Sequence, residues 1–334
     1  ILASVARNNG QETNRYDLTL GNTELRRQIA RRSLDWGCNF SVEEIVTTVG
    51  ATEALNLCLR AVTKPGDTVV VESPTYFGFL QILESLNLKA LEVSTHPRDG
   101  ICLDALESAV KRQPVAACFI MSNFHNPLGS CMPEENKKQL VDLMAKRGIP
   151  IIEDDVYSDL WFGKEPPLSL KSHDTDGLVL HIGSMSKTLS PGLRIGWIAG
   201  PITVIEHLAD IKMQTDYGSS ALSQHLVAEW LASGQYAKHL EWLRHELRER
   251  RDFTLSLLNQ DFKGIAEWQI PQGGFYIWLK LCKPIVNPNL FQQAIKENIL
   301  INPGFIYEPN NNTHLRLSYS YASEEQLAYG IQTL

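Results

Sequence analysis

One lysine of the sequence lies in an unusual setting. Lys187 follows small hydroxyl residues and precedes a Pro-Gly turn in the segment GSMSKTLSPGLRIGW (183–197). Three interpretations compete: a solvated loop lysine, the base of a Ser-x-x-Lys hydrolase, or an amine that holds an aldehyde cofactor. A hydrolase of that kind also needs Ser-Asp-Asn and Lys-Thr-Gly elements. The chain has only SDL at 158–160 and KTL at 187–189, so the hydrolase interpretation is weak.

An aldehyde cofactor such as pyridoxal phosphate makes demands that can be checked one by one. It needs an amine for a Schiff base, a carboxylate against its ring nitrogen and donors for its phosphate. It also needs a group at its phenolic oxygen and a flat face on which to stack. A lysine in a largely buried site suits the first demand, because desolvation lowers its pKa and frees the neutral amine. Lys187 is our candidate for that amine.

Two polar segments follow apolar runs and could meet the ring. IIEDDVY (151–157) ends in three acids and a tyrosine, and a carboxylate at the carboxyl end of a parallel strand points to where open α/β sheets bind ligands. Asp154 would keep the ring nitrogen protonated, while at least one of the three acids is expected to cap the next helix. From NFHNPLG (123–129), Asn126 could donate to the phenolic oxygen alongside the hydroxyl of Tyr157.

Donors for the phosphate come from two further segments. Gly50, Ala51 and Thr52 lie between an apolar run and a helical stretch. Free backbone amides and the helix dipole form an anion site at such a place without any positive side chain. Ser184 and Arg194 would add a hydroxyl and a bidentate guanidinium.

Two further residues are candidates for a stacking face and for a general base. The segment ESPTY (72–76) would put the Tyr76 ring at the same sheet edge, and the alternative is a packed loop aromatic. His125 could act as a general base, although a lone loop histidine is more often structural.

The elements that must position these residues follow an alternating pattern. Short β-branched runs alternate with helical stretches, which predicts a mostly parallel seven-stranded sheet covered by helices on both faces. The polar run Lys89–Val93 is expected near an edge. The predicted strands are 45–48, 68–72, 89–93, 115–122, 149–153, 179–183 and 195–199, and the predicted helices among them are 52–62, 78–88 and 134–146.

The pattern changes from about Ser219. Two long helical stretches precede strand-like runs and a further helix, which indicates a smaller α+β domain after a large one. We therefore expect domains at 1–240 and 241–334. The predicted elements are helices 221–233, 235–260 and 289–298 and strands 274–281 and 314–319.

Composition excludes several classes of protein. The 334 residues are 43% hydrophobic and 21% charged, as in soluble globular proteins, and no run reaches the 18 apolar residues or so of a membrane span. A net charge of −7 does not indicate the basic surface that is typical of nucleic-acid-binding domains. No metal-ligand spacing occurs. The cysteines are expected to be reduced core residues of a cytoplasmic protein: Cys38, Cys58, Cys102, Cys118, Cys131 and Cys282.

The ends of the chain suggest a longer polypeptide. The sequence starts at Ile1, without the basic start and apolar stretch of a signal peptide. We therefore expect both ends to be cut.

Five segments in order carry a specific resemblance. TVGATEAL, ESPTY, NFHNPLG, IIEDDVY and GSMSKTLSPGLRIGW resemble the fold-type I, class I and II pyridoxal-phosphate aminotransferases, over essentially the whole chain. The resemblance implies transfer of an amino group between an amino acid and a 2-oxo acid, with the cofactor linked to Lys187 as an aldimine. It implies ring contacts by Asp154, Tyr157, Asn126 and Tyr76, and phosphate contacts by Gly50, Ala51, Thr52, Ser184 and Arg194.

Two further roles come from the resemblance alone. NTHLRLS (312–318) is similar to the family strand whose arginine grips the substrate α-carboxylate, which makes Arg316 the substrate anchor beside Asn126. RYDLTLG (15–21) resembles the segment whose tyrosine bonds the phosphate held by the other subunit, so Tyr16 implies a homodimer. The alternatives are an exposed strand arginine and a helix-entry aromatic.

Within the family, two segments suggest a subtype. SKTLSPGLRIGW and GQYAKHLEWLRHELRERRDF look most like the aminotransferase-like domain of MocR-type GntR-family regulators. There a winged helix-turn-helix domain precedes this one, so DNA would be bound only through a domain that this chain does not contain. The alternative is a free-standing aminotransferase of the 2-aminoadipate or aromatic type. The family's N-terminal arm, which closes over the substrate, is not in the sequence either.

Overall fold

The main sheet carries the predicted alternating pattern. The computed structural model describes residues 1–8 and 10–334, and its larger sheet has the strand order β1-β8-β7-β6-β5-β2-β3-β4. Neighbours from β7 to β3 run parallel, whereas β8 is antiparallel to both β7 and β1. The mostly parallel sheet is thus confirmed. Its strands are β1 (Ile45–Thr48), β2 (Thr68–Ser73), β3 (Lys89–His96), β4 (Gly100–Ile101), β5 (Ala117–Ile120), β6 (Ile151–Asp154), β7 (Val179–Ser184) and β8 (Gly196–Ala199).

One strand of the main sheet was not expected, and neither were two short strands of the second sheet, at 266–268 and 302–303. β4 has two residues and forms an antiparallel edge with the end of β3, where Thr95 pairs with Ile101 and His96 with Gly100. A strand of two residues carries no period that a sequence pattern can reveal. The run predicted at Lys89–Val93 extends to His96 and lies next to this edge strand, with alternate side chains exposed.

Helices cover both faces of the sheet. Along β2, Val69 and Val71 pack in one cluster with α3 (Ala51–Val62) and α4 (Phe77–Ser85), while Val70 packs on the other face with α5 and α6. This alternation follows from the two-residue period of a strand. The other helices of this part are α1 (Leu2–Asn8), α2 (Thr23–Arg32), α5 (Leu103–Arg112), α6 (Glu134–Ala145), α7 (Ile202–Met213) and α8 (Ala221–Ala232).

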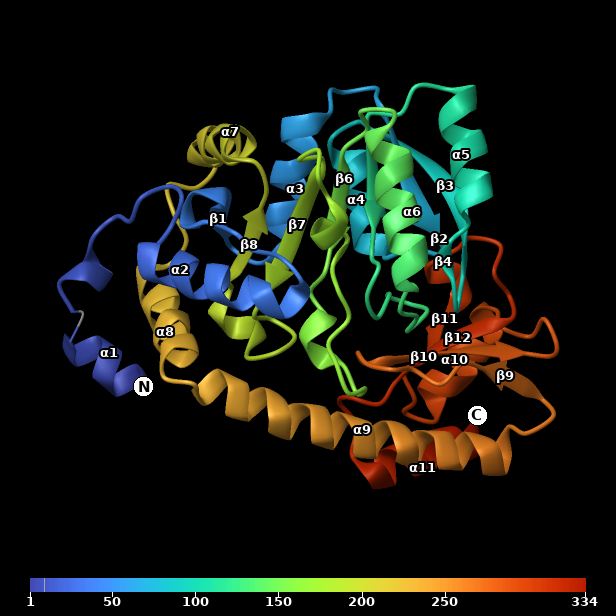
Figure 1. Cartoon of the computed structure of the whole chain (residues 1–334). Helices are drawn as coiled ribbons and strands as arrows, with labels where there is room; N and C mark the ends of the chain where they lie inside the picture. Colours follow the sequence, from blue (N-terminus) through green and yellow to red (C-terminus); the bar gives the residue numbers. More distant parts are fainter. Residues whose placement is uncertain (9) are drawn as a thin grey trace.

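A second sheet follows a long helix. In Figure 1, α9 (Gln235–Asp261) runs from α8 past the main sheet to the second sheet, with α11 alongside. The second sheet is antiparallel throughout, in the order β11-β12-β10-β9. The division predicted at 240 and 241 falls inside α9 and stays a prediction. The elements are β9 (Ala266–Trp268), β10 (Tyr276–Leu281), α10 (Pro288–Lys296), β11 (Asn302–Pro303), β12 (His314–Ser318) and α11 (Glu324–Thr333).

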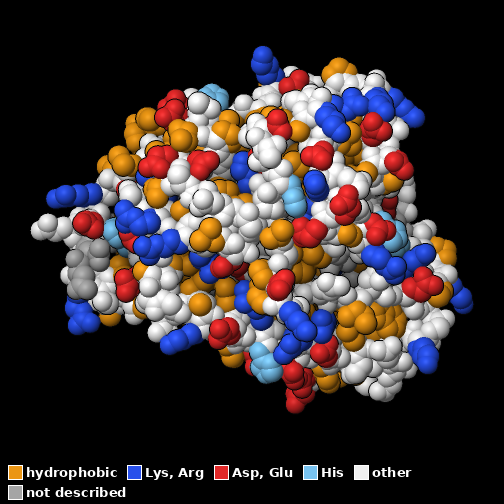
Figure 2. Space-filling model, in the orientation of Figure 1, with side chains coloured by type: hydrophobic (Ala, Val, Ile, Leu, Met, Phe, Trp, Pro, Cys, Tyr) orange, Lys and Arg blue, Asp and Glu red, His pale blue; other side chains and the backbone are white. Residues whose placement is uncertain are grey.

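The surface carries charges of both signs, and the cysteines differ in exposure. Acidic and basic side chains are interspersed over the face shown in Figure 2. Among the described residues, no helix is both long enough and apolar enough to span a bilayer. All six cysteines are free, and Cys38, Cys58 and Cys118 are buried as expected. Cys102 and Cys282 are exposed, so the expectation of core positions is wrong for these two.

Candidate active site

The predicted polar segments meet at one edge of the main sheet. The parallel strands β2, β5, β6 and β7 end there, and β1 points the same way because β8 is antiparallel to both β1 and β7. Thr48 and Ser184 both pair with Gly196, the first residue of β8. The loops that follow five strand ends and the loop that precedes β8 therefore share this edge, where open α/β sheets bind ligands.

A tight turn forms the start of α3. Gly50 has φ +81°, and a Cβ built on it would lie 2.3 Å from Nη2 of Arg194. That nitrogen donates a hydrogen bond to the carbonyl of Val49 at 2.9 Å. The helix begins at Ala51, so the first amides, including that of Thr52, have no acceptor within the helix. Free amides and a guanidinium thus lie together, which suits a phosphate.

Ser184 lies at the same edge, but its hydroxyl is engaged. The side chain is 5% exposed, and its Oγ lies 3.1 Å from the carbonyl oxygen of Ile195. The same Oγ accepts the backbone N–H of Ser186 at 3.1 Å. In this structure the hydroxyl therefore shapes the loop that carries Lys187.

Lys187 lies on a loop whose next residue, Thr188, is hydrogen-bonded by two side chains. The hydroxyl of Tyr236 donates to Oγ1 of Thr188 at 2.7 Å, and Nε2 of His239 lies 2.9 Å from the carbonyl oxygen of Thr188. Both partners come from α9. The Lys187 side chain itself is exposed, so the expectation of a largely buried lysine is wrong for the single chain. Its Nζ lies 5.9 Å from the centre of the Tyr157 ring.

Asp154 is a buried acid with an unused oxygen. The side chain is 4% exposed, and its Oδ1 has no hydrogen-bond partner among the described residues. Burial raises the pKa of Asp154 to about 6, and the backbone amide of Val156 and the charge of Lys187 oppose a larger rise. A buried acceptor without a donor is costly, so this oxygen is suited to a charged N–H group of a ligand.

The two neighbouring acids have other partners. Glu153 accepts the backbone N–H groups of Leu170 and Lys171 at 2.5 and 3.1 Å, and its Oε2 lies 3.3 Å from Nδ1 of His181. One acid was expected to cap the next helix, and Glu153 instead caps a distant 3-10 turn, Leu170–His173. Burial, and next the charge of Glu153, raises the pKa of Asp155 to about 8.

These side chains also form the only group with metal-ligand geometry that we find in the described part of the chain. One ligand atom each from Glu153, Asp155 and His181 lies within 4.8 Å of the others. Asn123 further donates to Asp155 at 2.8 Å. Sequence spacing did not indicate this group, because its members come from two strands. Of the three side chains, Asp155 contributes the one buried polar atom, Oδ2, that has no hydrogen-bond partner among the described residues.

Tyrosines surround the space beyond Asp154. The hydroxyls of Tyr157 and Tyr276 lie 3.2 Å apart. Burial, followed by the nearby Tyr276, raises the pKa of Tyr157 well above its ordinary value, so this phenol stays protonated and can donate. Tyr76 is half-buried at the start of α4. Burial and then the charge of Asp154 raise the pKa of Tyr76, which agrees with a ring beside that acid.

Arg316 joins the second sheet to the first. Its Nη1 donates to Oδ1 of Asn126 at 2.8 Å. Its guanidinium carbon lies 4.1 Å from the centre of the Tyr276 ring and 5.2 Å from that of Tyr307. The Nε atom has no hydrogen-bond partner in the described part of the chain. A guanidinium fixed in this way still offers donors to a carboxylate.

Sequence reasoning missed Tyr276 and Tyr307. Neither lies in a recognised motif, and the signal that would have found Tyr276 is the pairing of β10 with β12, the strand of Arg316. His125 is buried beside an acid, and its structural role stays a prediction. It is 1% exposed, and its Nε2 lies 3.3 Å from Oε2 of the equally buried Glu72.

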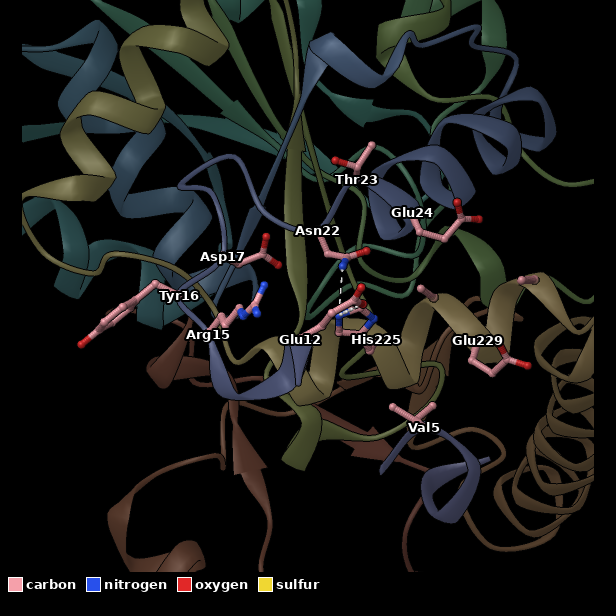
Figure 3. A pocket seen from close by; sticks show the side chains of 12 residues that line it. Val5, Glu12, Arg15, Tyr16, Asp17, Asn22, Thr23, Glu24, His225 and Glu229 are labelled. Atoms are coloured by element: carbon pink, nitrogen blue, oxygen red, sulfur yellow. Dashed lines mark hydrogen bonds and ion pairs between the residues drawn. The ribbon is translucent and has the colours of Figure 1, made fainter. Parts of the chain in front are cut away.

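Tyr16 is not brought to this site within the chain. Its side chain is 93% exposed, and its ring centre lies 6.1 Å from that of Tyr217. Figure 3 shows Tyr16 at the rim of a cavity of about 640 Å³, pointing away from Asn22 and His225. A role for Tyr16 at the site therefore needs a second copy of the chain.

Known proteins resemble the chain in sequence and in fold. The family of class I and II aminotransferases matches residues 1–334. The uncharacterized HTH-type transcriptional regulator YisV of Bacillus subtilis is 42% identical over 95% of this chain and 65% of its own length. NorG, an HTH-type transcriptional regulator of Staphylococcus aureus, is 37% identical over 95% of this chain and 71% of its own length.

Solved structures of two enzymes superpose closely. Kynurenine aminotransferase of Pyrococcus horikoshii has a TM-score of 0.93 and 28% identity, covering 99% of this chain and 83% of that enzyme. LysN, the α-aminoadipate aminotransferase of Thermus thermophilus, has a TM-score of 0.92 and 30% identity, covering 99% and 85%. The chain thus spans about two thirds of the length of the regulators and most of the length of the enzymes.

Proposed function

Since the chain belongs to the family of class I and II aminotransferases, we propose that it binds pyridoxal 5'-phosphate and transfers an amino group between an amino acid and a 2-oxo acid. The observation that carries this is the buried, unpaired Oδ1 of Asp154, at the same sheet edge as Lys187 and the turn at Gly50. An anion cradle, an amine and a buried carboxylate are the three groups that this cofactor needs.

The residues would share the work as follows. When bound, the cofactor supplies an aldehyde that condenses with amines and a ring that withdraws electrons. Asp154, with a pKa of about 6, is mostly ionised at neutral pH and would hold a proton on the ring nitrogen. Lys187 would provide the amine that attaches the cofactor, and it would move the substrate proton. Tyr157, with its raised pKa, and Asn126 would donate to the phenolic oxygen, and Tyr76 would stack on the ring.

The phosphate and the substrate would be bound by different groups of residues. The turn at Gly50, the amides of Ala51 and Thr52, and Arg194 would hold the phosphate, with Ser184 contributing after its hydroxyl turns from the loop. The contact of Arg194 with the turn at Gly50, at the start of α3, supports this assignment. Arg316, already held by Asn126, would bind the substrate α-carboxylate.

A homodimer would complete the site. Tyr16 is exposed and points outward, as expected of a side chain that reaches the phosphate bound by a neighbouring subunit. We also propose that residues 1–240 form the cofactor-binding domain and that 241–334 form the smaller domain, with α9 joining them.

The full-length protein is proposed to be a transcriptional regulator of the GntR/MocR type, with this chain as its effector or catalytic domain. The regulators YisV and NorG support this at 42% and 37% identity, whereas the enzymes reach 28% and 30%. The second candidate is a free-standing aminotransferase, a class with the same fold as this chain. Footprinting of the full-length product on its own promoter separates the two: no protection, together with rapid turnover of an amino donor, would support the enzyme.

Attachment of the cofactor is the direct test. The protein loaded with pyridoxal phosphate should absorb visible light, and borohydride reduction followed by peptide mapping should place the label on Lys187. Lys187→Ala should lose both signals, whereas Lys171→Ala, which removes another amine from the same region of the sequence, should keep them. A label on a different lysine would overturn the assignment.

A further inference from the structure

Lys212 is a fully buried lysine outside every sequence motif. It lies on α7 with 0% exposure, although lysine is almost never fully buried unless it is paired. Its Nζ lies 3.2 and 3.1 Å from the two carboxylate oxygens of Glu53 and 3.0 Å from Oδ2 of Asp216. The three contacts use the three donors of the ammonium group.

Glu53 connects this lysine to the turn before α3. It is the third residue of the helix, and its Oε2 accepts the backbone N–H of Val49 at 2.6 Å. The carbonyl of the same Val49 accepts from Arg194. Both backbone polar groups of one residue, Val49, are therefore bound by charged side chains, immediately before Gly50.

The charge of Glu53 needs a counterion at this position. Its carboxylate lies in the first turn of the helix whose free amides form the proposed phosphate site, so an uncompensated charge there would repel a phosphate. Arg194 is bound to the other side of the same turn. Lys212, on α7, supplies the buried positive charge next to Glu53.

We propose that Lys212 is a positioning residue for the phosphate site: it holds Glu53 against Val49 and offsets the charge of that carboxylate, while it also pairs with Asp216. The inference rests on the proposed binding of pyridoxal phosphate. It assigns a function in cofactor affinity to a side chain that does not touch the cofactor.

The test compares two ligands that differ only in the phosphate. Lys212→Met removes the charge and keeps most of the side-chain volume. We expect it to raise the Kd for pyridoxal phosphate about tenfold, equivalent to about 1.4 kcal/mol, and to leave the Kd for pyridoxal within about twofold of the wild-type value. Both are measured by absorbance titration of the cofactor-free protein. Equal weakening for both ligands, or no weakening for either, would overturn the proposal.

Two further variants make the result specific. Glu53→Gln/Lys212→Met removes both charges next to the turn, leaves only the partly exposed Asp216 without its lysine and keeps an acceptor for Val49, so it should restore the Kd for pyridoxal phosphate to within about threefold of wild type. The control is Lys137→Met, because Lys137 is also 0% exposed and pairs with Glu134, on α6. It should alter neither Kd, even if it lowers stability.

The two ligands can still be compared if Lys212→Met does not fold. Should Lys212→Met be insoluble, Glu53→Gln alone keeps an acceptor for Val49 and leaves Lys212 paired with Asp216. It should bind pyridoxal phosphate at least as tightly as wild type, and a tenfold loss confined to the phosphorylated ligand would refute charge compensation. If the wild-type protein itself attaches no pyridoxal phosphate, the proposed function fails instead, which is a distinct result.

Discussion

The two sides of the site are built differently. On the sheet-edge side, Asp154 is the last residue of β6 and the turn at Gly50 follows β1, so the register of one sheet fixes both. On the second-sheet side, Arg316 is held by Asn126 from the loop after β5 and by the ring of Tyr276 from β10. The proposed cofactor side is thus set by one sheet, whereas the proposed substrate side lies where the two sheets meet.

The largest effect is expected on the sheet-edge side. Asp154→Asn keeps the shape but cannot hold a proton on the ring nitrogen. Removal of one preorganised electrostatic contact costs about 10²–10³ in rate, so single-turnover conversion of an amino donor should slow by about that factor. Stopped-flow absorbance of the loaded protein measures it.

The neighbouring acid provides the control. Asp155 is equally buried, but it is bound to Asn123 and lies beside His181. Asp155→Asn should change the same rate by less than about threefold. A comparable loss in both variants would mean that the two acids are not separated in function as their contacts indicate.

On the second-sheet side, the effect should be confined to the substrate. Arg316→Ala removes a charge-assisted pair with a carboxylate, which should weaken binding of the amino acid by about 2–4 kcal/mol. The cofactor content should stay unchanged. Titration of the loaded protein with amino donor, followed by its absorbance, gives the affinity, and equal affinity in variant and wild type would remove Arg316 from this role.

This division also explains what the sequence could predict. The segments on the sheet-edge side are contiguous, so the strand that begins IIEDDVY and the strand that precedes GATEAL already place Asp154 and Gly50 at one edge. Tyr276 is near Arg316 only because β10 pairs with β12, and no local pattern contains that pairing. Lys212 was missed for the same reason, since its partner Glu53 precedes it by 159 residues.

Exposure was the property that local pattern predicted least well. Lys187 follows a buried strand, yet its side chain is exposed in the single chain. Burial of a loop side chain depends on what packs against it from elsewhere, which includes a second subunit. The strand pattern, by contrast, predicted seven of the eight strands of the main sheet, because a short apolar run between turn residues is a local property.

The unpaired acid should also cost stability. The pKa of Asp154 is raised from 3.8 to about 6, so the folded state binds this proton more tightly than the unfolded state does. The resulting stability is fully present below pH 3.8 and is lost as the pH rises through about 6. In the cofactor-free protein, Asp154→Asn should therefore gain about 2–3 kcal/mol over wild type between pH 4 and pH 8. Urea unfolding at both pH values measures this, and a difference that does not change with pH would contradict it.

The smallest effect separates two tyrosines on the second-sheet side. Tyr276→Phe leaves the buried hydroxyl of Tyr157 without its partner at 3.2 Å, which should lower the free energy of unfolding by about 1 kcal/mol. Tyr307 is the matched control, because its buried hydroxyl has no hydrogen-bond partner among the described residues. Tyr307→Phe should leave the stability unchanged or raise it slightly. Urea unfolding of both variants tests this, and an equal loss in both would show that the contact between the two hydroxyls does not hold this side of the site together.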